Sequence, residues 1–262
     1  MLTPVLAACL ATVATAAELP LAGVLKERMG VAAETVPVYE PHLSTGDRRV
    51  VVEYVGYPVV EVMARLFGDD WQNRGEAVEY RALDGYVSRI PVRRFLKDNA
   101  WLVFARADGA PFTVDNIRQN QADVPLGPYY LVWDNISRPA LLAEGARNWP
   151  YQVKEVNLVT LSEGALLPEG LDPQYHEGAG LAREHCLNCH RVNGFGGDKF
   201  EADLAALTKR YSRESFLRVV LTPASERPGA TMPAISERLS ETERLRIADE
   251  IFDYLKAVPV QQ

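Results

Sequence analysis

The sequence predicts two domains, an α+β domain followed by an all-α domain at the C-terminal end of the 262-residue chain. Up to about residue 160, short β-branched and aromatic segments mix with short amphipathic ones, without a regular βαβ rhythm. Residues 161–174 contain two glycines and two prolines and show no hydrophobic period, which is typical of a linker. Beyond the linker, apolar residues recur at helical spacing.

The N-terminal domain is expected to span residues 18–160. Runs of β-branched and aromatic residues predict strands at 50–55, 77–83, 100–105, 129–133 and 151–159. Apolar periodicity predicts a helix at 59–67. Short helical stretches are expected at 91–96 and 21–29, and the polar stretch 113–123 is expected to be a loop. The aromatic side chains are expected to fill the core, whereas His42, in a proline-flanked loop, is expected on the surface.

The C-terminal domain is expected to span residues 175–262 and to begin with a helix at 178–185. A second helix is expected at 213–221, where Pro223 follows its end. The segment from Ser240 to Glu243 reads as a capping box that opens a last helix. That helix carries one apolar stripe, formed by Ala248, Ile251, Phe252, Leu255 and Val258.

Composition limits the classes of partner. Apolar residues make up 47% of the chain, enough for a substantial core, and the formal net charge is −7. A nucleic-acid partner would require a basic face, so we expect none. An acidic protein instead favours a docking partner with a complementary positive patch.

Residues 1–17 read as a secretory signal peptide. They carry no charged side chain, and Ala14-Thr15-Ala16 supplies a small-residue cleavage signal ahead of Glu18. We therefore expect a periplasmic protein, with membrane contact only if this segment is retained as an anchor. Removal of the peptide also removes Cys9, so that Cys186 and Cys189 are the remaining cysteines.

The central motif of the chain is Cys186-Leu187-Asn188-Cys189-His190. Two cysteines separated by two residues and followed by histidine are typical of a c-type haem attachment site. The two thiols form thioethers with the haem vinyl groups, and His190 serves as an axial ligand of the iron. We therefore expect one covalently bound haem c.

Other interpretations of this motif stay open at the level of sequence. A thioredoxin-like redox motif would follow a strand, whereas the residues before Cys186 are expected to be helical. A zinc site could use Cys186, Cys189, His185 and His190, but ligands this close in sequence do not easily surround one ion tetrahedrally. A disulfide between the two cysteines is also possible.

Met232 is the candidate for the second axial ligand. It lies 42 residues beyond His190 in a loop that contains Pro228, Gly229 and Pro233 rather than on a helical stripe. A methionine that only fills a gap in the core is the alternative. His176 and His185 are rival ligands, although we expect both at the surface or beside the haem propionates.

The sequence from Tyr175 onward resembles the class I c-type cytochromes. The resemblance rests on the C-x-x-C-H motif, the glycine-rich turn at 191–197, and the loop at 227–234 that contains Met232. It implies an all-α fold in which His190 and Met232 bind the haem iron. It also implies that the last helix crosses the first, with Phe252 or Tyr254 near Gly178 or Gly180.

Residues 75–160 resemble the molybdopterin-binding domain of the sulfite-oxidase family. The matching segments are 84–91 with 95–96, 102–105 with 108–112, 124–132 and 149–154. That family binds its metal through a cysteine thiolate, but this chain has no cysteine between Cys9 and Cys186. The resemblance thus implies an α+β fold at 18–160 without a molybdopterin cofactor.

Together these features predict a periplasmic one-electron carrier with a His/Met-ligated haem. The N-terminal domain would act as a docking or organising module for a redox protein partner. Two alternatives remain. The first is a redox enzyme, either a sulfite-dehydrogenase-like molybdenum protein or a peroxidase-like haem protein. The second is a fixed electron-transfer subunit of a respiratory complex.

Overall fold

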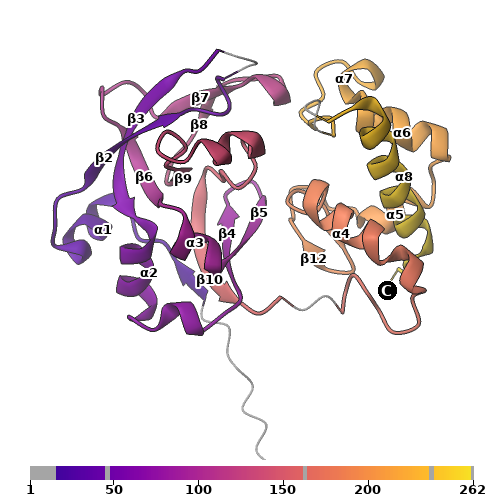
Figure 1. Cartoon of the computed structure of the whole chain (residues 1–262), viewed down its shortest axis with the longest axis horizontal. Coiled ribbons are helices and arrows are strands. Elements are labelled where there is room, and N and C mark those ends of the chain that lie inside the picture. The colour runs from indigo at the N-terminus through magenta and orange to yellow at the C-terminus, as the bar shows by residue number, and fades with distance from the viewer. Residues whose placement is uncertain (1–15, 45–47, 162–163, 236–238, 261–262) are drawn as a thin grey trace, which may run out of the picture.

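The computed structural model describes residues 16–44, 48–161, 164–235 and 239–260 (Figure 1). The expected signal peptide, residues 1–17, lies outside the described residues except for its last two. Ala16 and Ala17 belong to strand β1 (Ala16–Glu18), which pairs with β10 (Val153–Val159). None of the helices in the described ranges combines the length and hydropathy that a membrane span requires.

One four-stranded antiparallel sheet has the order β1-β10-β4-β5, with β4 at Ala77–Ala82 and β5 at Val87–Pro91. Val78 lies opposite Leu158 on one side and Ile90 on the other. All three side chains are buried. This apolar cross-strand row fixes the register of the sheet, because a slip of one residue would turn it toward the opposite face.

A second four-stranded antiparallel sheet has the order β2-β3-β6-β9. Its strands are β2 (Glu34–Tyr39), β3 (Val51–Pro58), β6 (Ala100–Arg106) and β9 (Tyr130–Trp133). The helices of this part are α1 (Ala22–Met29), α2 (Val59–Phe67) and α3 (Val92–Lys97). Helix α2 contacts β3 and β6, and its apolar stripe is buried against them.

The short hairpin β7 (Thr113–Asn116) and β8 (Gln121–Pro125) corrects one expectation, because residues 113–123 were predicted to be a loop. The hairpin was not predicted because most of its side chains are polar. The segment therefore shows no regular alternation of apolar and polar residues. Short 3-10 helices occur at Trp71–Asn73, Ile117–Gln119, Pro139–Glu144 and Pro173–Tyr175.

Aromatic side chains fill the N-terminal core, as predicted. Trp133, Tyr54 and Tyr130 are almost completely inaccessible, and Trp71 and Trp149 are also buried. Phe95 stacks on Trp133 at a centroid distance of 5.1 Å. Trp101 differs, since its side chain is half-buried and its indole N–H donates to Glu34.

The residues after 164 form a second hydrophobic cluster. The helices are α4 (His176–His185), α5 (Leu204–Thr208), α6 (Arg213–Leu221), α7 (Pro223–Glu226) and α8 (Glu241–Ala257). Helix α8 contacts α4, α5 and α6. The expected N-cap is confirmed, because the Ser240 hydroxyl accepts a hydrogen bond from the Glu243 N–H, and the five stripe residues are buried.

Gly178 makes the crossing of α4 and α8 possible. A Cβ atom at this position would lie 2.3 Å from the Glu250 carbonyl oxygen and 2.7 Å from Tyr254 Cβ. Gly180 has no such neighbour within 4 Å. The resemblance implied a close approach of the last helix at Gly178 or Gly180. Of these two glycines, only Gly178 lies against α8.

The predicted fold class is wrong in its description of the C-terminal part as all-α. Strands β11 (Arg191–Val192) and β12 (Phe195–Gly196) form an antiparallel pair there, and Arg191 also bridges to Asp203. The glycines after His190 were interpreted as a simple turn, but their backbone pairs as a small sheet. Across the described residues the chain has an α+β fold rich in β-structure, with no distinct all-α domain.

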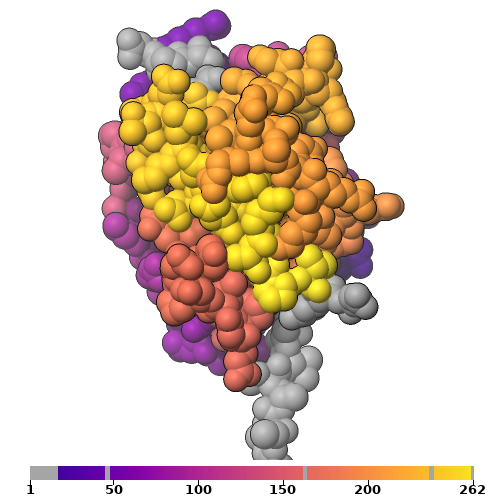
Figure 2. All heavy atoms as spheres, turned by 90° about the vertical axis from the view of Figure 1, so that its right-hand side faces the viewer, coloured from indigo at the N-terminus to yellow at the C-terminus, as the bar shows by residue number. Residues whose placement is uncertain are grey.

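Hydrogen bonds join the C-terminal part (residues 164–260) to the N-terminal part (residues 16–161). The Val87 N–H donates to the Asn188 carbonyl at 2.8 Å, and the Asp198 N–H donates to the Gly85 carbonyl at 2.8 Å. Lys199 forms an ion pair with Asp84 at 2.7 Å. Figure 2 shows the C-terminal part in front of the N-terminal part, which it largely covers in that view.

Candidate functional site

Helix α4 ends directly in the cysteine motif. The Cys186 N–H completes the helix by donating to the Ala182 carbonyl at 2.8 Å. The Cys186 carbonyl then accepts hydrogen bonds from the N–H groups of Cys189, at 3.2 Å, and His190, at 3.0 Å. This single turn brings both thiols and the imidazole together, as the spacing of the motif predicts.

Two glycines allow the following segment to pack closely against this turn. A Cβ atom on Gly196 would lie 2.1 Å from the His190 carbonyl oxygen, and one on Gly197 would lie 2.1 Å from the Asn188 carbonyl oxygen. Gly196 also has a φ angle of 133°, which residues with a side chain rarely adopt. The Gly197 N–H donates to both the Leu187 and the His190 carbonyls at 2.9 Å, which holds the turn in place.

The predicted site residues share one cavity of about 120 Å³, which we call the ligand cavity. Cys186, Cys189, His190 and Met232 all line it. Its walls are mostly apolar and include Leu204, Leu207, Phe216, Val219 and Val220. The structure therefore brings the four residues together, although Met232 comes from a loop 42 residues beyond His190.

His190 is in the form that binds a metal. Burial lowers the pKa of His190 below its usual value, so the ring is neutral at pH 7 and keeps a free lone pair. The ring stacks on Phe200 at a centroid distance of 4.7 Å and an interplanar angle of 17°. Met232 is half-buried and packs against the C-terminal cluster.

The thiols do not have the properties of a redox-active C-x-x-C pair. Both cysteines are free. Burial raises the pKa of Cys186 to about 12. Burial also raises the pKa of Cys189 to about 11, although the charge of Lys199 acts in the opposite direction. A thioredoxin-like cysteine instead has a lowered pKa, and here a helix, not a strand, precedes the motif.

The zinc alternative also finds no support in the part of the chain that the structure describes. No group of three or more histidine, cysteine, aspartate or glutamate side chains is placed there to hold a metal ion. By contrast, the residue types that line the ligand cavity are those that a covalently attached haem uses. They are two thiols on one turn, an imidazole and a thioether.

The rival axial ligands lie in different settings. His176 is exposed at the start of α4 and does not line the ligand cavity. His185 is half-buried and does line it, with Nε2 3.9 Å from a Glu184 carboxylate oxygen. Burial lowers the pKa of His185, partly offset by the negative charge of Glu184.

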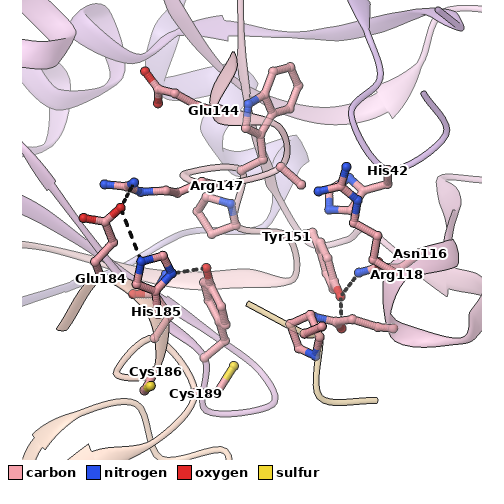
Figure 3. A pocket seen from close by; sticks show the side chains of 18 of the residues that line it. His42, Asn116, Arg118, Glu144, Arg147, Tyr151, Glu184, His185, Cys186 and Cys189 are labelled. Atoms are coloured by element: carbon pink, nitrogen blue, oxygen red, sulfur yellow. Dashed lines mark hydrogen bonds and ion pairs between the residues drawn. The ribbon is translucent and has the colours of Figure 1, made fainter. Parts of the chain in front are cut away.

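A larger cavity of about 380 Å³ lies between the two parts of the chain (Figure 3), and we call it the junction cavity. Cys186, Cys189 and His185 line it as well as the ligand cavity. Its other wall comes from the N-terminal part and includes His42 and Tyr151. The cysteine edge of the ligand cavity thus faces a space that the N-terminal part helps to enclose.

His42 corrects another expectation, because it is not a surface residue. It is 6% exposed, and its Nδ1 lies 2.7 Å from Oε1 of the fully buried Glu40. The hydroxyls of Tyr54 and Tyr130 also donate to the Glu40 carboxylate, at 2.7 and 3.0 Å. A glutamate two residues before a histidine is the one signal in the sequence, and the tyrosines come from strands distant in sequence.

Burial alone would raise the pKa of Glu40, but its partners outweigh that effect. The hydrogen bond and charge of His42 and the hydrogen bond from Tyr54 lower the pKa of Glu40 below 4.5 overall. The carboxylate is therefore ionised at neutral pH. An ionised carboxylate can only accept hydrogen bonds, so Nδ1–H of His42 donates to Oε1 of Glu40 at 2.7 Å.

Comparison of the chain with protein-family models and with curated proteins finds no match. The expected assignment, a class I cytochrome domain fused to a sulfite-oxidase-type domain, is wrong as a description of this chain. The described residues form a mixed α+β fold with strands in both parts and contain no three-residue metal-binding group. The short motifs that suggested those families do not define the fold.

Proposed function

We propose that this chain is an exported, periplasmic electron-transfer protein that carries one covalently attached haem c. The proposal is carried by one observation, the shared ligand cavity of Cys186, Cys189, His190 and Met232. No other cysteine of the described residues is available for a thioether, because Cys186 and Cys189 are the free cysteines found there.

Each residue has a defined role in this proposal. Cys186 and Cys189 would hold the haem through thioethers, and His190 and Met232 would ligate its iron. The bound haem supplies a centre that gains and loses one electron. A methionine sulfur in place of a second imidazole would raise the reduction potential, and with both residues bound the iron would have no open position for a substrate.

The N-terminal part acts as the docking or organising module. Its turn at 84–87 binds the backbone of Asn188, between the two cysteines, so it covers this side of the site. The partner is a redox protein, and the net charge of −7 favours a partner with a positive docking surface. We expect neither a nucleic-acid partner nor a molybdopterin cofactor.

The test is to express the full chain in cells that attach haem c and to measure its absorption spectrum and iron content. We expect one iron per chain and a haem that stays bound after denaturation. The double variant Cys186→Ala/Cys189→Ala should lose the covalent haem, whereas His176→Ala, at an exposed histidine, should retain it. A colourless, folded product from such cells would refute the proposal.

Two further measurements separate the carrier from its alternatives. Molybdenum in stoichiometric amount, or a high-spin ferric spectrum, would indicate a redox enzyme instead of a carrier. Size-exclusion chromatography of a native extract distinguishes a diffusing carrier from a fixed respiratory subunit, because a subunit would elute with its complex.

A further inference from the structure

The ligand cavity alone is too small for the haem that its residues would hold. Its volume is about 120 Å³, whereas cofactor sites measure roughly 300–1,000 Å³. The junction cavity, of about 380 Å³, falls within that range and adjoins the ligand cavity. A haem attached at the cysteines would therefore extend into the space between the two parts of the chain. Six residues line both cavities, namely Gln119, His185, Cys186, Cys189, Lys199 and Pro233.

The N-terminal part supplies aromatic walls for this space. Trp149 and Tyr151 line the junction cavity together with Cys186 and Cys189 (Figure 3). Both rings are flat and largely apolar, and such surfaces pack against the face or the edge of another aromatic system. The junction cavity is therefore suited to a planar, mostly apolar group that is attached at the cysteine turn.

The turn between β7 and β8, residues 117–120, reaches the ligand cavity itself. Gln119 lies in this β7–β8 turn and lines the ligand cavity together with Met232. The Asn116 amide donates to the Tyr151 hydroxyl at 3.3 Å, and the same hydroxyl lies 3.5 Å from Oε1 of Gln119. These contacts join the turn to the aromatic wall. The N-terminal part thus borders both cavities and not only the junction cavity.

Asn120, at the end of the same turn, holds the loop that carries Met232. Its side-chain amide donates to the Ala230 carbonyl at 3.0 Å, two residues before Met232. Asn120 has a φ angle of 51°, a left-handed conformation that asparagine adopts more readily than most residues with a side chain. Together with the hydrogen bond from Val87 to Asn188, this contact bonds the N-terminal part to both the cysteine turn and the methionine loop.

We propose that the haem site is shared between the two parts of the chain, with the β7–β8 turn closing it and Asn120 positioning Met232. This inference rests on the proposed haem attachment and goes beyond it, because all four residues that would bind the haem belong to the C-terminal part. The hydrogen bond from Asn120 keeps the methionine loop, and with it the thioether, at the ligand cavity. Without that bond the thioether would leave the haem iron more often.

The first test uses Asn120→Gly in the full-length, haem-loaded protein. Glycine adopts a φ angle of 51° readily, so this change removes the amide without straining the turn. Cyanide should bind about fivefold faster than to the unchanged protein, as expected for loss of one hydrogen bond. The near-infrared iron–sulfur band should also disappear at a lower temperature. Asp123→Gly, in the same hairpin and with the same φ angle, is the matched control and should change neither property. Equal cyanide rates in the two variants would overturn the role of Asn120.

The second test fills the junction cavity from the N-terminal side. Ala146 lines this cavity, so Ala146→Phe should lower the amount of covalent haem per chain. Ala107→Phe introduces the same side chain at an exposed position outside both cavities and should leave haem attachment unchanged. Equal haem yields in these two variants would show that the haem does not enter the junction cavity and would overturn the shared site. Absence of haem from the unchanged protein would instead refute the proposed function, so the two failures are distinguishable.

Discussion

Nδ1 of His42 lies 2.7 Å from Oε1 of Glu40, and both residues are buried beneath the junction cavity. Two tyrosine hydroxyls complete the contacts of the carboxylate. The network joins three separate chain segments. Its loss should therefore lower the free energy of unfolding of the whole N-terminal part.

The Glu40 network should make the protein sensitive to acid. The pKa of Glu40 is lowered in the folded state, so its contribution to stability is complete above the unfolded carboxyl pKa of about 4.5 and is lost as the pH falls through the lower, folded value. Glu40→Gln should therefore flatten the decline in unfolding free energy below about pH 5. At pH 7 this variant should lose about 3 kcal/mol, because it removes the ionised acceptor of the buried hydrogen bonds from His42, Tyr54 and Tyr130.

Urea unfolding at a series of pH values measures this effect. Glu61→Gln, at an exposed carboxylate on α2, is the matched control and should reproduce the pH profile of the unchanged protein. If the Glu40→Gln profile runs parallel to the control, Glu40 does not cause the acid sensitivity.

Met232→Ala should change the spectrum of the haem without releasing it. The thioethers of Cys186 and Cys189 would still hold the group, but the near-infrared band that reports an iron–sulfur bond should disappear and added ligands such as cyanide should bind faster. His185→Ala tests the rival ligand and should leave that band in place. Loss of the band in His185→Ala and its survival in Met232→Ala would reverse the assignment.

The two glycines of α4 offer a matched pair. Gly178→Ala should destabilise the protein by about 1–3 kcal/mol, because the new methyl group meets the backbone of α8 at 2.3 Å. Gly180→Ala has open space in the same helix and should stabilise it by about 0.5–1 kcal/mol. Thermal unfolding of both variants compares them directly, and equal shifts would show that α4 and α8 do not cross as closely as described.

Gly196→Ala should impair the cysteine turn itself. Both the φ angle of 133° and the 2.1 Å approach to the His190 carbonyl oppose a side chain, so we expect a loss of about 2 kcal/mol and a lower yield of attached haem. Gly194→Ala is the control for backbone conformation alone, because its φ angle is 80° but no atom lies within 4 Å of the added Cβ. Haem yield per chain, measured on denaturing gels by haem staining, separates the two variants.

Sequence periodicity predicted the elements whose buried face is continuous. Helix α2 and helix α6 have the predicted bounds, and α8 begins after Ser240 as its capping box indicates. The elements that were missed lack such a face. Strand β2 contains Pro37, β7 and β8 are polar, and β11 and β12 have two residues each.

The sequence predicted the cysteine turn but not the junction cavity. Local spacing placed Cys186, Cys189 and His190 on one turn, since the chemistry of the motif lies within five residues. The junction cavity depends on the docking of residues 84–87 against Asn188 and on a histidine whose partners come from strands β3 and β9. No local pattern encodes contacts between segments so far apart, so His42 was taken for a surface residue.

The hydrogen bond from Val87 to the Asn188 carbonyl has a practical consequence for work with fragments. Asn188 lies between the two cysteines, and its side-chain amide also donates to the Tyr86 hydroxyl at 2.7 Å. A fragment that starts after residue 161 would leave both of these groups to water and would expose the cysteine turn on that side. Spectra and potentials of such a fragment would describe a different environment from the one present in the intact chain.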